Sequence, residues 1–209
     1  MTTRRSAALI AMVFGVCGMV ALLALGSGAR ADAQSPPAHA DDGAAAAAFE
    51  AIVPVLRHPR CMNCHSNGDY PRQGDDGHPH TMQVRRGPNG FGANVVECST
   101  CHQDHNLAGW HTPPGAPNWH MPPPDRPMIW EGLSDRQLCE LFKDPKQNGG
   151  RDPQAIAEHM NTPLVLWGWH PGPGRTPVPL SQAQFLAKVQ EWADKGAACP
   201  LETATPSQH

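Results

Sequence analysis

The 209-residue sequence has few of the residues that build an aromatic core or a nucleic-acid-binding surface. It contains one Tyr and five Phe, and only 17% of its residues are charged, with a formal net charge of −3. Beyond residue 33, 13 basic and 18 acidic residues remain, so this part carries a net charge of −5. Nucleic-acid binding requires Lys and Arg that neutralise phosphates, and this composition argues against such a partner.

The sequence also has little regular hydrophobic periodicity and contains 23 prolines. Because Pro fixes φ and has no backbone N–H, so many prolines exclude a chain that is mostly regular helix or sheet. No acid–base constellation of the kind found in enzymes stands out from the many scattered His residues. The protein must therefore obtain much of its apolar interior from something other than regular packed elements.

Two short motifs share the pattern Cys-x-x-Cys-His, at residues 61–65 and 98–102. This pattern is the attachment signature of c-type haem. Two thiols three residues apart can bond to the two vinyl groups on one edge of a porphyrin, and the adjacent imidazole can ligate the iron. The sequence therefore predicts two haem c groups, each a large flat hydrophobe around which loops can pack. The predicted attachment residues are Cys61, Cys64, Cys98 and Cys101, and the predicted proximal iron ligands are His65 and His102.

Zinc is the alternative occupant of these motifs, since two Cys-x-x-Cys pairs can supply four thiolates to one structural metal. Such a site does not require a His after each pair. Haem is also attached outside the cytoplasm, which agrees with the N-terminal sequence. Both observations favour haem.

Residues 1–33 have the features of a secretory signal peptide. Arg4 and Arg5 precede an apolar run from Ala7 to about Leu25, and residues 31–33 offer an Ala-x-Ala cleavage site. An uncleaved membrane anchor is the alternative, because the run approaches the length of a membrane span. We predict an exported, periplasmic protein that contacts a membrane only if this segment is retained.

The seven cysteines are then assigned as follows. Cys17 lies in the apolar run, four cysteines belong to the haem motifs, and Cys139 and Cys199 remain. In an oxidising compartment two remaining cysteines most simply form a disulfide, and two buried free thiols are the alternative.

The predicted fold is mainly α with much irregular loop, a multihaem-cytochrome-like domain packed around two covalent haems. This domain is expected at residues 47–200, between a flexible linker at 34–46 and a disordered tail at 201–209. Apolar periodicity and capping signals predict helices at about 44–56, 135–143, 153–159 and 182–195. Turn-forming residues dominate stretches 66–97 and 103–130, which we expect to wrap the haems.

The ligand on the opposite side of each iron decides whether the haem only carries electrons or also has an open binding site. From their position in the loops after each motif, we predict His80 for the first haem and His120 for the second, with Met128 as the alternative at the second. The wider set of candidates is His78, His80, His111, His120, Met121, Met128, His159, Met160 and His170.

Further stretches accompany the two motifs: Gln73–Asp76, Pro117–His120, Lys143–Pro145 with Asn148–Arg151, and Leu166–Trp169. Together they resemble small exported di-haem proteins labelled as isoquinoline 1-oxidoreductase subunits. The resemblance implies an electron carrier that takes electrons from a partner oxidoreductase, such as a molybdenum hydroxylase, and passes them to a downstream acceptor. The alternatives are a di-haem redox enzyme of the peroxidase or reductase type, and a haem-based ligand sensor with one open iron site.

Overall fold

The computed structural model describes residues 41–93 and 96–202, which form helices joined by long loops and a few two-residue strands. The helical elements are α1 (Asp42–Leu56), α2 (Pro59–Met62), η1 (Cys98–Thr100), α3 (Asp135–Lys143), α4 (Pro145–Asn148), α5 (Pro153–Met160), α6 (Pro163–Leu166), η2 (Trp167–Trp169) and α7 (Gln182–Asp194). The strands are β1 (Arg72–Gln73), β2 (His78–Pro79), β3 (Gly92–Ala93) and β4 (Val96–Glu97), paired as two antiparallel hairpins. This confirms the mainly helical class with much irregular loop.

The four predicted helices are present, with small differences at their ends. α3 has the predicted bounds, and both α3 and α7 begin with the predicted capping boxes, Ser134 with Gln137 and Ser181 with Gln184. α1 begins at Asp42, so residues 42–46 of the predicted linker belong to this helix. The reason is that the Ala-rich segment buries Ala45 in the core instead of leaving it in solvent.

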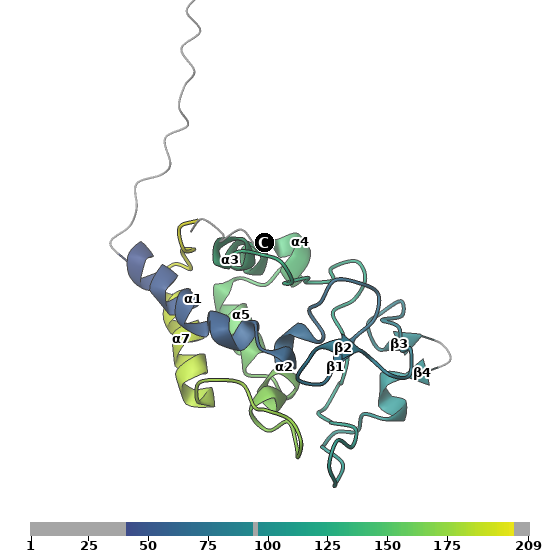
Figure 1. The fold of residues 1–209 in the computed structure, drawn as a ribbon. Helices are drawn as coiled ribbons and strands as arrows, with labels where there is room; N and C mark the ends of the chain where they lie inside the picture. The colour runs from purple at the N-terminus through teal and green to yellow at the C-terminus, as the bar shows by residue number, and fades with distance from the viewer. Residues whose placement is uncertain (1–40, 94–95, 203–209) are drawn as a thin grey trace, which may run out of the picture. The chain divides into compact units, whose positions relative to one another are not determined.

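The core lies where α1 and α7 run side by side, with α3 and α5 packed around them (Figure 1). The ring of Phe49 on α1 lies 5.6 Å from that of Trp192 on α7 and 5.7 Å, edge to face, from that of Phe142 on α3. All three side chains are almost completely buried. α1 continues through Pro54 to Leu56, because buried residues on both sides of the proline hold its last turn in place.

A disulfide joins Cys139 on α3 to Cys199 after α7, with an S–S distance of 2.05 Å, as the sequence predicted. It fastens the end of the described chain to the helical core. The four motif cysteines form no disulfide.

The hairpin β1–β2 is attached to α2, which contains the first motif cysteine. The backbone N–H of Arg72 donates to the carbonyl of Asn63 at 2.8 Å. The side chain of Asn63 donates to the carbonyl of Gly74 at 2.9 Å. Arg60 on α2 forms an ion pair with Asp75. The other hairpin, β3–β4, leads directly into η1 and the second motif, so each motif has a hairpin beside it.

Within residues 41–93 and 96–202, no helix has the length and apolarity needed to cross a membrane. The predicted signal peptide at 1–33 and the first part of the predicted linker, 34–40, lie outside the described residues, as does most of the predicted tail.

Candidate functional site

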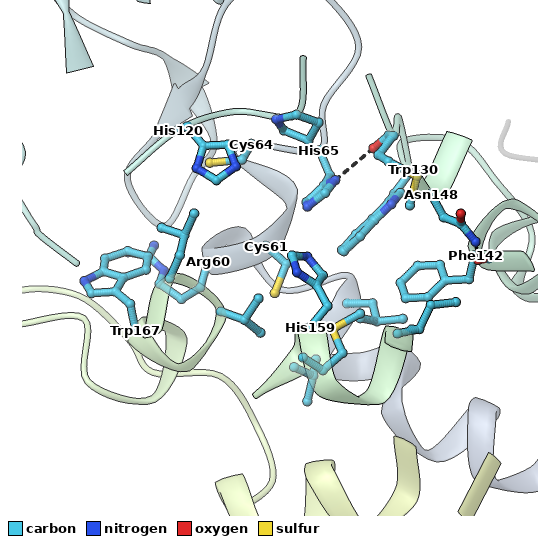
Figure 2. Close-up of a pocket in the computed structure, with 18 of the residues that line it drawn as sticks. Arg60, Cys61, Cys64, His65, His120, Trp130, Phe142, Asn148, His159 and Trp167 are labelled. Carbon is cyan, nitrogen blue, oxygen red and sulfur yellow. Dashed lines mark hydrogen bonds between the residues drawn. The ribbon is translucent and has the colours of Figure 1, made fainter. Parts of the chain in front are cut away.

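The first Cys-x-x-Cys-His motif lies on α2 and the turn that follows it. Cys61, Cys64 and His65 line a cavity of about 260 Å³ (Figure 2). The walls of the cavity are mainly apolar and come from α1, α2, α5, α6 and the loop before α3. The three side chains therefore share one cavity.

The imidazole of His65 is held by two partners from one loop. Its Nδ1 lies 2.9 Å from the carbonyl oxygen of Met128, and since that carbonyl can only accept, Nδ1 carries the hydrogen. The indole of Trp130 stacks on the imidazole, with ring centres 3.5 Å apart and planes 6° from parallel. Burial lowers the pKa of His65 to about 3. The ring is therefore neutral at pH 7, and its Nε2 has a free lone pair.

The loop that holds His65 is fixed by its own contacts. The backbone N–H of Trp130 donates to the carbonyl of His65 at 2.9 Å, which makes the connection reciprocal. Glu131 accepts a hydrogen bond from the backbone of Asn67 and pairs with Arg72 at 2.8 Å. Met128 has a φ of 45°, a conformation that costs energy for a residue other than glycine. Its carbonyl is thus held toward His65 at the expense of local strain.

The second motif repeats this arrangement with different partners. Nδ1 of His102 donates to the carbonyl of Pro114 at 2.7 Å. The indole of Trp119 stacks on the imidazole, with ring centres 4.5 Å apart and planes 2° from parallel. Burial lowers the pKa of His102, so this ring too is neutral at pH 7 with Nε2 available. A metal-binding His commonly donates its Nδ1–H to a backbone carbonyl, which fixes the orientation of the ring.

The loop that carries Pro114 lies directly against the second motif. A Cβ added to Gly115 would lie 2.3 Å from the carbonyl oxygen of Gln103, so only glycine fits here. The backbone N–H of Gly115 donates to the side chain of Asn106, which also accepts from the indole of Trp167. Asn106 thus links the second motif to η2, which borders the first cavity.

Burial raises the pKa of the Cys61 thiol to about 12 and that of the Cys64 thiol to about 11. Burial also raises the pKa of Cys98. These thiols are therefore uncharged at neutral pH. In the part of the chain that the structure describes, no three or more His, Cys, Asp or Glu side chains come together as a metal-binding group.

The structure places the two predicted distal ligands as follows. His80, predicted for the first haem, lies beside His102 of the second motif, with ring centres 6.1 Å apart. His120, predicted for the second haem, lines the first cavity, and so does Met128. Loop order did not indicate these positions, because the β1–β2 hairpin returns the chain toward the second motif.

His159 and Met160 on α5 also line the first cavity. Figure 2 shows the ring of His159 pointing into the cavity from the side opposite the turn that carries His65. Burial lowers the pKa of His159 to about 4. Sequence analysis included His159 only among nine candidates, because nothing local distinguishes a His at the end of a helix that faces a cofactor from one that faces solvent.

Three Arg residues line the same cavity, Arg60, Arg126 and Arg151. Arg126 and Arg151 both approach Gly149, since a Cβ added there would lie 3.0 Å from Nη1 of Arg151 and 3.6 Å from Nε of Arg126. Gly149 has a φ of 76° at the end of α4, a conformation that glycine adopts without cost. This edge of an otherwise apolar cavity is therefore positively charged.

Searches of protein-family models, curated proteins and solved structures found no match to this chain.

Proposed function

We propose that this protein is a di-haem c-type cytochrome that carries electrons. The observation that supports this most strongly is the repeated local arrangement. Each Cys-x-x-Cys pair is followed by a neutral imidazole whose Nδ1 donates to a loop carbonyl and whose face stacks on a Trp. Two unrelated loops thus orient two imidazoles in the same way, which is the preparation that an iron ligand needs.

The residues present fit the group that the motifs imply. At the first motif, two thiols and an imidazole with a free Nε2 face a mainly apolar cavity whose lining includes Arg126 and Arg151. The apolar wall suits a porphyrin face, and the guanidinium groups suit its propionates. Haem, when bound, supplies an iron that changes between the ferric and ferrous states. The protein chain holds the group covalently, orients it through the imidazole and excludes water from its faces.

The two motifs also lie near enough for one domain to relay electrons between them. Proximity to Cys98 contributes to the raised pKa of Cys64, although burial is the larger cause. Trp119 stacks on His102 and also lines the first cavity. A shared wall of aromatic side chains between the sites suits single-electron exchange within the protein.

The location and the partners belong to the same proposal. An N-terminal signal sequence and a disulfide between Cys139 and Cys199 both suit the oxidising periplasm. The sequence resemblance favours a partner oxidoreductase, such as a molybdenum hydroxylase, as electron donor and a separate protein as acceptor.

Intact-protein mass tests this function directly. Expression in a host with a c-type haem maturation system should give a mature polypeptide that carries two tetrapyrroles. The double variants C61A/C64A and C98A/C101A should each carry one. A carrier should also show two low-spin irons, whereas a high-spin iron that binds carbon monoxide would indicate an open site instead. A polypeptide with no tetrapyrrole, or with zinc, would refute the proposal.

A further inference from the structure

We infer that His80 and His102 are the two axial ligands of one iron, so that the second haem has bis-histidine coordination. This inference rests on the proposed function, because it assumes a haem at the second motif. It concerns a ligand that enters from the hairpin following the first motif.

The spacing of the two rings fits a single metal ion between them. A His ring nitrogen lies about 1 Å from the ring centre and a metal–imidazole bond is about 2 Å long, so two imidazoles on opposite sides of one ion have centres about 6 Å apart. The ring centres of His80 and His102 are 6.1 Å apart, with planes inclined at 62°. Axial imidazoles can rotate about their common axis, so this inclination is compatible with shared ligation. The spacing is too long for direct ring stacking, unlike the 4.5 Å between His102 and Trp119.

The hydrogen bonding of His80 provides a second, independent observation. Its Nδ1 is buried and has no hydrogen-bond partner. A buried polar nitrogen without a partner destabilises the fold, so native proteins rarely leave one in this state. A metal ion accepts such a lone pair. Nδ1 of His102, by contrast, is already bonded to the carbonyl of Pro114.

The hairpin β1–β2 explains how His80 reaches the second motif. His80 directly follows β2, and its backbone N–H donates to the carbonyl of Pro71 at 3.1 Å. The side chain of Gln73 accepts from the backbone of Thr81 at 3.3 Å, which fixes the next residue. Since the hairpin is attached to α2 through Arg60 and Asp75, the segment that carries His80 has a defined position.

Four of the other candidates, His120, Met128, His159 and Met160, line the first cavity instead. Of the aromatic rings that the described residues place near His102, Trp119 has no lone pair to offer a metal, whereas His80 has one.

The test is the H80A variant of the di-haem protein, examined by absorption and electron paramagnetic resonance. We expect half of the low-spin intensity to be lost and replaced by a high-spin signal, and added imidazole should restore it. In the C98A/C101A background, where only the first haem remains, H80A should change nothing. The matched control is H78A, in which an exposed His two residues earlier on the same hairpin is removed.

A second variant decides the matter if H80A does not accumulate. H80M keeps a ligand at this position, and we expect both irons to remain low-spin while the potential of one haem rises, because Met ligation raises haem potentials. Unchanged spectra in H80A, or two unchanged potentials in H80M, would overturn the inference. The haem count of the unmodified protein separates this outcome from failure of the proposed function, since two tetrapyrroles with an unaltered H80A spectrum would contradict only the ligand assignment.

Discussion

The indole of Trp119 lies face to face with the imidazole of His102, with the two planes 2° from parallel, and the same indole lines the cavity of the first motif. At the first motif Trp130 has the corresponding place on His65, but it belongs to the core around α3. Both Trp residues thus stack on the imidazole of their own motif, but only Trp119 also contributes to the site of the other motif.

This difference predicts different effects for two matched substitutions. W119L should perturb the spectra of both haems, whereas W130L should perturb only the first. Because Trp130 is buried, W130L should also lower the free energy of unfolding by about 2–3 kcal/mol, somewhat less than the roughly 3–5 kcal/mol typical of Trp truncated to Ala. Spectra of each variant in the two single-haem backgrounds provide the measurement. If W119L changed only the spectrum of the second haem, the conclusion that Trp119 contributes to both haem sites would be wrong.

The ion pair between Arg60 and Asp75 predicts a dependence of stability on pH. Burial raises the pKa of Asp75. Hydrogen bonds from Thr176 and the charge of Arg60 together lower it by more than burial raises it, so the net pKa lies below 3.8. A carboxyl whose pKa is lower in the folded state stabilises the fold above its unfolded pKa, and this contribution is lost as the pH falls. The unmodified protein should therefore lose this stability as the pH drops below 3.8.

D75N should remove that part of the acid sensitivity and lower stability at pH 7 by about 2 kcal/mol. This is less than the roughly 3–5 kcal/mol for breaking a fully buried pair, because the Asp75 side chain is 44% exposed. Urea unfolding at a series of pH values gives both quantities. D104N is the control, since Asp104 is exposed and lies outside this ion pair. Equal acid sensitivity in D75N and the unmodified protein would refute the prediction.

The disulfide predicts a large contribution to stability because it closes a long loop. Cys139 and Cys199 are 60 residues apart, and the chain-entropy relation gives about 4 kcal/mol for a loop of this length. The C139A/C199A variant should show a corresponding fall in its denaturant midpoint. Under reducing conditions, which break the disulfide of the unmodified protein, the two proteins should become nearly equal. A difference that persisted in reductant would point to lost packing instead.

Two imidazoles are candidates for the second ligand of the proposed first haem. His159 and His120 both line the first cavity, and both lower the pKa of His65, for which burial is the largest cause. Figure 2 shows the ring of His159 pointing into this cavity. The ring of His120, by contrast, stacks on Phe91, which does not line this cavity.

We therefore expect H159L to convert the first iron to the high-spin state and H120L to leave its spin state unchanged. The measurement is electron paramagnetic resonance in the C98A/C101A background, which isolates the first haem. The reverse result would assign the ligand to His120, and no change in either variant would mean that both side chains only line the cavity.

Much of the helical framework could be predicted from the sequence because its signals are local. Ser134 and Ser181, each followed three residues later by Gln, mark helix starts through contacts within one turn. The stripe of Phe185, Val189 and Trp192 on α7 follows helical periodicity and is buried. The predicted start of α1 is two residues late because Asp42 and the alanines after it resemble a linker in composition. Only packing against α7 distinguishes a helix from a linker here.

The sequence by itself determined that two thiols and one imidazole lie together at each motif, because Cys-x-x-Cys-His brings them within five residues, and haem attachment there stays a prediction. It also determined that Cys139 and Cys199 would be the pair left for a disulfide. Only the tertiary structure decided which groups complete each site. The partners of His65 and His102 are a carbonyl 63 and 12 residues away, and the ring of His80 arrives from a hairpin beside the other motif. Such contacts depend on how loops cross in space, and no local pattern of residues encodes that crossing.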